Sequence, residues 1–558
     1  MNDRRIPLSF HLLLLGIAIL CLIPRLILGA SQFIEYDGYW HVWIAHQIPW
    51  GNFISEYRAN AHPPLYFPLL WLTFWFGHTS LSYRAISILT GAGSVYLVGM
   101  IAWRCVRSRI WAALAALAYG LALPSILVSE EVRTYMMAAF LVQASFWYYL
   151  DLIADGRGPL RSRILFGALT TLACLTEYYA LIYAGAALLF ALIVQPLRQP
   201  KRGKDGALRA LGREALTFVL LLALPVWEYF AHFGGKPEAY NHLPDFYFQP
   251  DGAESLPGFL LRNLRTEFNG FSPIQIPEGT AFYAMLAFCL LAAAAIFWLA
   301  RHWSQNRDIA AAATVIIPLA MLGAIMFGGA VRVYPFGGAL RQQYILFPFF
   351  AICPFLLLDR ALAKAPRSAV LVAAALLTVG IGYASYVDYD AYPKDSRPQM
   401  SDQMQRYNRL FPTAPAVFLD QFNVTTFFLH HHDWNWSFVA DLPASEAVDV
   451  YKLQRDGRSI VLFRDKDRWN LDLRDPQLYV NMARGMKTWR LPEMTILSLA
   501  DPVPPKPRTG PQVTAYRARV AELSAAQGLC IQTLDFDNYD VYAAFRAAGT
   551  CTAPPQSQ

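Results

Sequence analysis

About eleven long apolar stretches recur along this chain of 558 residues, and they restrict the possible fold more than any other feature. A helix needs roughly 20 apolar residues to cross the hydrocarbon core of a bilayer. Backbone polar groups must be satisfied internally there, so helices are the expected spanning elements. We predict an all-α polytopic membrane protein with spans at about 7–28, 84–103, 110–128, 134–151, 164–177, 179–196, 215–232, 281–300, 309–328, 344–358 and 369–387.

The composition agrees with a membrane protein. Only 16% of the residues are charged and 55% are hydrophobic, whereas soluble domains average about 25% charged. The net charge of +7 is concentrated in short basic loops, so it indicates membrane topology and not a nucleic-acid partner. The first apolar run lacks a small-residue cleavage site, so it reads as a span and not as a signal peptide.

The stretch HPPLYFPLLWLTFWFG (62–77) is apolar but short and rich in proline. If it does not cross the membrane, every strongly basic loop falls on the same side as the N-terminus, which the positive-inside rule assigns to the cytoplasm. We therefore predict an interfacial or re-entrant helix. The first external loop is then 29–83, another is 233–280, and the cytoplasmic loops are 104–109, 155–163, 198–213, 301–307 and 359–367.

The last third of the chain resembles a soluble domain. Strand-like runs at 416–422 and 459–465 alternate with helix-like stretches such as 514–528, and a Pro-containing linker lies at 390–399. We predict a transmembrane domain at 1–388 and an extracytoplasmic α/β domain at 389–558. Cys530 and Cys551 are the two cysteines of this tail and can pair in an oxidising compartment, although their spacing alone does not decide it.

Two carboxylates follow the first span in FIEYDGYWHVW (33–43). Charges beside a bilayer are costly and often functional. Glu35 and Asp37 share a face on a strand and diverge on a helix. Asp37 is the candidate general base that accepts a proton from an acceptor hydroxyl, with Glu35 and Glu131 as further catalytic candidates. The alternative is an aromatic loop with solvated acids.

A second group of candidates would bind a phosphate-bearing substrate. Arginine suits bidentate phosphate contacts, and the Gly-Gly pair in RVYPFGGALRQQY (332–344) permits close backbone approach. Simpler alternatives are acids that favour a helix N-terminus, snorkelling arginines and a turn-capping acid. The candidates, all expected on the external face, are His62, Arg133, Tyr135, Glu177, Arg332, Arg341 and Tyr344.

The HHHDW stretch (430–434) has the composition of a metal site. Consecutive histidines point in different directions, however, and no spaced partner is evident. A surface loop is therefore the favoured interpretation, and the metal ligands of the protein are unknown.

The order of these motifs resembles the GT-C superfamily of membrane glycosyltransferases. The resemblance rests on one span, the acidic motif, HPPLYFPLLWLTFWFG, SYRAISILTGAGSVYLVGMIAWRC and SEEVRTYMMAAFL, over about residues 8–200, and more loosely on YPFGGALRQQYILFPF (334–349). The most similar branches are those of the protein O-mannosyltransferases, the lipid A aminoarabinose transferase and the rhizobial lipopolysaccharide sugar transferases. Asp37 matches the first acid of the family pair, Gly38 replaces the second, and Glu177 stands where many relatives carry His or Lys.

The resemblance implies inverting transfer of a sugar from a polyprenyl-phosphate donor to a glycan, lipid or protein hydroxyl at the outer face of a bacterial inner membrane. Membrane lipids are further partners, and a divalent cation, Mg²⁺ or Mn²⁺, is considered as a cofactor. A lipid-linked sugar flippase is the main alternative, but it predicts charges buried in mid-span and inverted repeats. A non-catalytic anchor for the tail is the third.

Overall fold

The computed structural model describes residues 6–32, 34, 36–48, 51, 53–106, 108–155, 159–198, 203–233, 244–250, 252–271, 306–337, 340–392, 409, 416–418, 437–441, 448–455, 458–465, 476–488, 493–498, 511–535 and 540–546. The chain divides into two compact units. Met1–Gln32 and Ile44–Lys394 form the membrane unit, and Phe33–Trp43 and Asp395–Gln558 form the tail unit.

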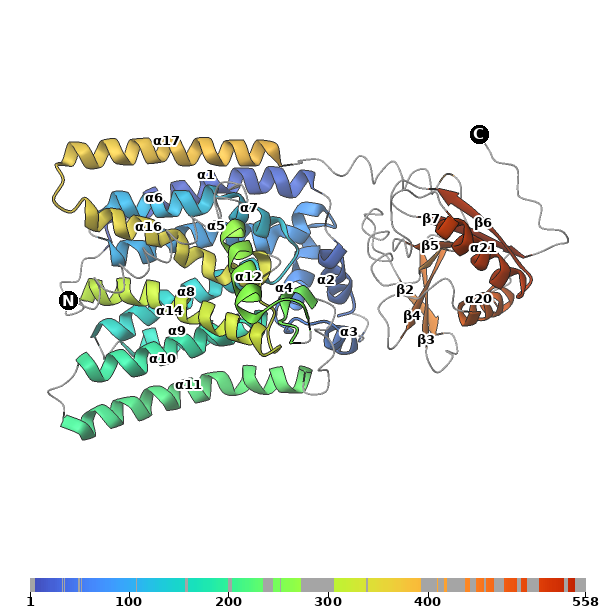
Figure 1. The fold of residues 1–558 in the computed structure, drawn as a ribbon, viewed down its shortest axis with the longest axis horizontal. Coiled ribbons are helices and arrows are strands. Elements are labelled where there is room, and N and C mark those ends of the chain that lie inside the picture. The colour runs from blue at the N-terminus through green and yellow to red at the C-terminus, as the bar shows by residue number, and fades with distance from the viewer. Residues whose placement is uncertain are drawn as a thin grey trace. The chain divides into compact units, whose positions relative to one another are not determined.

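Long helices lie side by side in the membrane unit (Figure 1). Six described helices are long and apolar enough to cross a membrane, and the α6–α7 pair, bent by 53°, would be a seventh span. The six are α1 (Leu8–Ser31), α5 (Ser80–Cys105), α8 (Tyr135–Asp155), α14 (Asn306–Ala330), α16 (Phe347–Ala361) with the short turns before it, and α17 (Arg367–Ala391), and the bent pair is α6 (Arg109–Leu121) and α7 (Leu123–Glu130). Three further long helices are α9 (Leu160–Thr176), α10 (Ala180–Arg198) and α11 (Gly203–Phe233).

These helices confirm a polytopic all-α membrane protein. Each predicted span coincides with one of them or with the α6–α7 pair, except 281–300, which lies outside the described residues. The split of 164–196 is confirmed, because α9 ends at Thr176 and α10 begins at Ala180. The single span predicted at 110–128 is instead a broken pair, because Pro124 restarts the helix after Ala122, which is extended.

Short elements gather at one end of this bundle. They are α3 (Phe53–Ala59), α4 (Tyr66–Thr73), η1 (Phe74–Phe76), η4 (Pro244–Phe246), α12 (Leu256–Phe271), α15 (Leu340–Gln343) and η5 (Tyr344–Leu346). Figure 1 shows α12 running across the direction of the long helices. We call this the site end.

The first loop begins and ends at the site end. One guanidinium nitrogen of Arg84 near the start of α5 donates to the carbonyls of Gly29 and Gln32, at 3.0 and 3.1 Å, where α1 finishes. Helix α4 has 8 residues and η1 has 3, which is too short to cross a bilayer. This agrees with the prediction that 62–77 does not cross the membrane, and its interfacial or re-entrant position stays a prediction.

Small residues let the spans approach closely. A Cβ added at Gly99 in α5 would collide with Leu14 of α1, and one at Gly120 in α6 would collide with Cys21. Glycine contacts of this kind are typical of helix packing in membranes, where dispersion must supply the attraction.

The tail unit contains a seven-stranded mixed sheet. Its strand order is β2-β3-β4-β1-β5-β7-β6, with β1 parallel to β4 and β5 and the other pairs antiparallel. The elements are β1 (Ala416–Phe418), β2 (Ser437–Asp441), β3 (Val448–Arg455), β4 (Arg458–Asp465), α20 (Pro476–Thr488), β5 (Glu493–Ser498), α21 (Pro511–Ala525), β6 (Leu529–Asp535) and β7 (Asp540–Arg546).

This sheet with its helices confirms the predicted α/β character of the tail. Cys530 in β6 is disulfide-bonded. Its predicted partner Cys551 and the HHHDW stretch lie outside the described residues.

Candidate functional site

His62 is fixed by its local sequence. It follows α3, and its backbone N–H donates to the Asn60 side chain at 2.9 Å. Two prolines come next and hold the chain away from a helix. The N–H of Leu65 then donates to the carbonyl of Leu175 at 3.1 Å, which ties the HPPL segment to the end of α9. The His62 side chain is thereby buried and directed at the turn between α9 and α10.

Glu177 supplies the carboxylate of that turn. It follows α9 with an extended backbone, and its N–H still donates to the Ala173 carbonyl at 2.9 Å. Its Oε2 lies 2.6 Å from His62 Nδ1 and also accepts from the Thr134 hydroxyl. Glu177 was predicted as a turn cap or a site carboxylate, and the structure gives it buried side-chain partners from two other segments.

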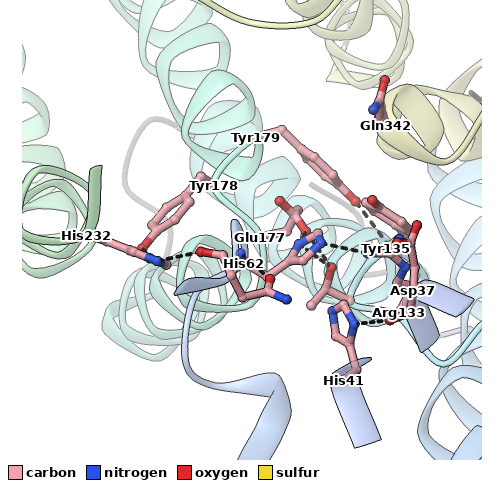
Figure 2. A network of polar contacts seen from close by, with 12 residues as sticks. Asp37, His41, His62, Arg133, Tyr135, Glu177, Tyr178, Tyr179, His232 and Gln342 are labelled. Carbon is pink, nitrogen blue, oxygen red and sulfur yellow. Dashed lines mark hydrogen bonds and ion pairs between the residues drawn. The ribbon is translucent and has the colours of Figure 1, made fainter. Parts of the chain in front are cut away.

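Arg133 completes the cluster from the join between α7 and α8. One of its terminal nitrogens lies 3.0 Å from His62 Nε2. A guanidinium can only donate, so Nε2 accepts and the His62 proton is assigned to Nδ1, facing Glu177. Figure 2 shows this chain of Glu177, His62 and Arg133. We call these three residues with Thr134 the polar cluster.

Aromatic rings border the polar cluster. The Tyr135 ring lies 5.6 Å from the His62 ring, edge to face, and the Arg133 guanidinium carbon lies 5.7 Å from the centre of the Tyr135 ring. Tyr179 stacks on Tyr135 at 6.3 Å, and its hydroxyl donates to the Tyr135 carbonyl at 3.3 Å.

A second set of contacts ties α11 to the first loop. His232 Nε2 donates to the Asn60 carbonyl at 2.8 Å, and its Nδ1 lies 2.8 Å from the Tyr178 hydroxyl. The Tyr57 hydroxyl donates to Glu228 at 2.9 Å. Sequence reasoning missed these residues because the paired positions are more than 50 residues apart and belong to no shared motif.

Three further candidates lie near the polar cluster. Half-buried Glu131 follows α7 and lies close enough to Tyr66 and Tyr135 for an electrostatic interaction with each. The Arg341 guanidinium on α15 also acts electrostatically on Tyr135. Tyr344 is fully buried, and its hydroxyl shares a 2.8 Å hydrogen bond with that of Tyr119. Tyr344 therefore faces the helix core between α6 and η5.

Other predicted residues are placed elsewhere. Arg332 is exposed with a φ of 63°, and its Nε donates to the Phe248 carbonyl at 2.9 Å. Asp37 is in the first turn of α2 (Tyr36–His46), in the tail unit, and its carbonyl accepts from His41 Nδ1 at 2.8 Å. Glu35 lies outside the described residues, and the role of Asp37 stays a prediction.

Within the part of the chain that the structure describes, no three His, Cys, Asp or Glu side chains are arranged to hold a metal ion. The divalent cation remains a prediction, and no step below depends on it. What the polar cluster provides is a buried carboxylate, a neutral imidazole and a guanidinium in one chain, with Arg341 nearby. The carboxylate and the imidazole fix the orientation of the Arg133 guanidinium, which suits the binding of an anionic group.

Comparison with known proteins yields no matching family model and no matching curated protein sequence. Solved structures do match. The crystal structure of ArnT from Cupriavidus metallidurans in the apo state is 15% identical, with a TM-score of 0.55, over 96% of this chain and 98% of that one. The structure of the same protein bound to undecaprenyl phosphate is 14% identical, with a TM-score of 0.54 and the same coverage. The chain therefore has a fold like that of ArnT along nearly its whole length.

Proposed function

We propose that this protein is an inverting glycosyltransferase that moves a sugar from a polyprenyl-phosphate donor to a hydroxyl acceptor at the outer face of the membrane. The observation that carries the proposal is the buried polar cluster, in which His62 orients Arg133 at one end of a transmembrane bundle. The fold of the chain is like that of ArnT, which has been crystallised with undecaprenyl phosphate.

Arg133 and Arg341 would hold the donor phosphate. Displacement of polyprenyl phosphate builds negative charge on the leaving oxygen, and preorganised cations stabilise that charge in the transition state. Glu177 accepts from His62, and His62 accepts from Arg133, so the carboxylate sets the imidazole tautomer that orients the guanidinium. The polar cluster thus serves leaving-group stabilisation.

Asp37 would act as the general base. The acceptor oxygen attacks the anomeric carbon, the bond from that carbon to the phosphate oxygen breaks, and the acceptor proton passes to the Asp37 carboxylate. Attack from the face opposite the phosphate inverts the anomeric configuration. Glu131 is the further carboxylate that we propose for acceptor contacts, since Gly38 occupies the position of a second acid.

The proposed location is a bacterial inner membrane with the site end outside. A disulfide at Cys530 suits a tail in an oxidising compartment. The basic loops 104–109 and 359–367 join helices at the end of the bundle opposite the site end, as the positive-inside rule requires of cytoplasmic loops.

Transfer of radiolabelled sugar from a synthetic polyprenyl-phosphate donor, by the purified protein in nanodiscs, tests the proposal. Asp37→Asn should reduce turnover at least about 100-fold, the range of a lost general base. Arg332→Gln is the matched surface control and should retain activity. Full activity in Asp37→Asn would remove the assigned base. Movement of the intact donor across the bilayer without bond cleavage would favour the flippase.

A further inference from the structure

The broken span α6–α7 leaves the carbonyl of Gly120 without its helical partner. In a continuous helix the N–H of residue 124 would donate to the carbonyl of Gly120, but Pro124 has no N–H. A backbone group left unsatisfied inside a membrane costs several kcal/mol. Here Arg25 of α1 supplies the missing donor, because one of its terminal nitrogens lies 2.8 Å from the Gly120 oxygen.

Arg25 also holds both turns of α7. Its Nε donates to the Ser129 hydroxyl at 3.0 Å, and its second terminal nitrogen donates to the Ser125 hydroxyl at 2.7 Å. The side chain is fully buried, and its partners in the described structure are hydroxyls and carbonyls. The positive charge is favoured by the carboxyl end of α6, where the helix dipole is negative.

Arg84 of α5 fixes the last residue of α7. Its Nε donates to the Glu130 carbonyl, and the same side chain binds the final carbonyls of α1 at Gly29 and Gln32. Arg84 is 2% exposed. One guanidinium therefore joins the carboxyl ends of two helices, and the orientation of α7 depends on it.

The end of α7 determines where the polar cluster lies. Residues 131–134 connect α7 to α8, and within them Arg133 donates to His62 while Thr134 donates to Glu177. The Ser87 hydroxyl, one turn from Arg84, donates to the Arg133 carbonyl at 3.4 Å. Because this connection is short, a displacement of Glu130 would also displace Arg133 and Thr134.

We propose that Arg25 and Arg84 are positioning residues. They stabilise the broken span so that Arg133 and Thr134 meet the His62–Glu177 pair, without themselves touching the substrate. This inference rests on the proposed function as far as activity is concerned. Packing around the two residues is tight, because a Cβ added at Gly91 would collide with the Ser129 hydroxyl and lie 3.2 Å from Arg25 Nε.

A double-mutant cycle for transfer activity tests the inference. Arg84→Gln and Arg133→Gln should each lower kcat/KM roughly 10- to 100-fold, the range for hydrogen bonds to charged groups. If Arg84 acts through Arg133, the kcat/KM of the double variant should lie within about threefold of that of the less active single variant. The effects of coupled residues do not add in free energy. Multiplication of the two losses would overturn the inference.

Arg104→Gln is the matched control. Arg104 is in the same helix as Arg84 but pairs with Asp151 at 2.5 Å, at the opposite end of the bundle. The kcat/KM of folded Arg104→Gln should stay within about twofold of the wild type. In the double variant with Arg133→Gln, the two fold-losses should multiply, as they do for independent sites. Arg84→Lys should recover only part of the activity, since an ammonium cannot reach three separated carbonyls with fixed geometry. Full recovery with lysine would contradict the proposed geometry.

Hydrogen–deuterium exchange tests the same inference without any activity. Arg84→Gln should accelerate exchange of the peptide covering 127–135 at least about tenfold relative to the wild type, with 110–118 unchanged. If Arg84→Gln does not fold, Ser129→Ala, which removes one acceptor of Arg25, should show the same local pattern more weakly. Unchanged exchange at 127–135 would refute the positioning role even if transfer is demonstrated. Local acceleration in a protein with no transfer activity would support the positioning role and refute the proposed function.

Discussion

Arginines at the two ends of the bundle have different kinds of hydrogen-bond partner. At the end opposite the site, Arg104 pairs with the Asp151 carboxylate at 2.5 Å and lies 3.9 Å from the centre of the Trp147 ring. At the site end, Arg25 binds hydroxyls and carbonyls, and Arg133 donates to a histidine nitrogen. A carboxylate partner compensates a charge directly, whereas hydroxyl, carbonyl and imidazole acceptors fix the orientation of a guanidinium. We expect the oriented guanidinium of Arg133 to be the group that binds an anionic ligand at the site end.

The largest expected effect comes from the carboxylate that organises the polar cluster. Glu177→Gln replaces the charged acceptor that His62 and Thr134 share with a neutral amide. Hydrogen bonds to a charged group contribute about 1.5–3 kcal/mol each, and two are weakened here, so we expect a large drop in the unfolding temperature and a loss of transfer of at least about 100-fold. Thermal unfolding and single-turnover transfer in nanodiscs measure the two.

The control for that experiment is Glu254→Gln. Glu254 pairs with Arg262 at 2.9 Å on the surface, where both side chains are 40% or more exposed. An exposed pair contributes at most about 1 kcal/mol. Equal losses in the two variants would mean that the polar cluster has no special role.

Removing one arginine from each end tests the comparison directly. Arg133→Gln should weaken binding of undecaprenyl phosphate about 10- to 100-fold, as loss of a charged hydrogen bond to an anion does. Arg104→Gln should leave this affinity unchanged and lower stability by about 1 kcal/mol. Tryptophan fluorescence titration with the lipid phosphate measures both. Equal affinities in the two variants would contradict the assignment of the anion site.

Much of the fold could be predicted from the sequence because hydropathy and positive charge report directly on spans and loops. The apex at Glu177 and the short helices within 62–77 are examples. The bend at Ala122 was not predicted, since a hydropathy window measures length and not direction, although Pro124 was a usable signal. The connection at 131–134 agrees with the gap between the spans predicted at 110–128 and 134–151.

The site was predicted less completely. His62, Arg133 and Glu177 were chosen for their chemistry and lie in contact. Arg332 was chosen for the same chemistry but binds the Phe248 carbonyl. Thr134 was overlooked within a quoted motif because a hydroxyl carries no charge signal. Arg25 and Arg84 were overlooked because their partners are backbone carbonyls and serine hydroxyls, which carry no charge signal.

Thr134 should have an intermediate effect. Thr134→Val keeps the shape and removes the hydroxyl that donates to Glu177. Loss of a hydrogen bond to a charged group should lower kcat/KM roughly 10-fold. Thr134→Ser retains the donor and should stay within about threefold of the wild type. If valine and serine behave alike, the hydroxyl does not contribute to the polar cluster.

At neutral pH the smallest expected effect is that of His46, which lies in the first loop away from the polar cluster. His46 stacks on Phe74 at 4.4 Å and lies 5.6 Å from the His78 ring. Burial, with a smaller contribution from His78, lowers the pKa of His46 from 6.5 to about 3. Between these values the unfolded chain binds the proton and the folded protein does not. Stability should therefore fall with decreasing pH by up to about 1.4 kcal/mol per pH unit.

His46→Phe isolates that contribution. The aromatic stack is kept and the titrating group is removed, so the unfolding temperature should depend less on pH between about 6.5 and about 3 than in the wild type. Above pH 7 the two proteins should unfold within a few degrees of each other, because His46 is neutral in both states there. An unchanged slope in His46→Phe would assign the acid sensitivity to other groups and leave His46 as a packing residue, comparable to Phe74 beside it.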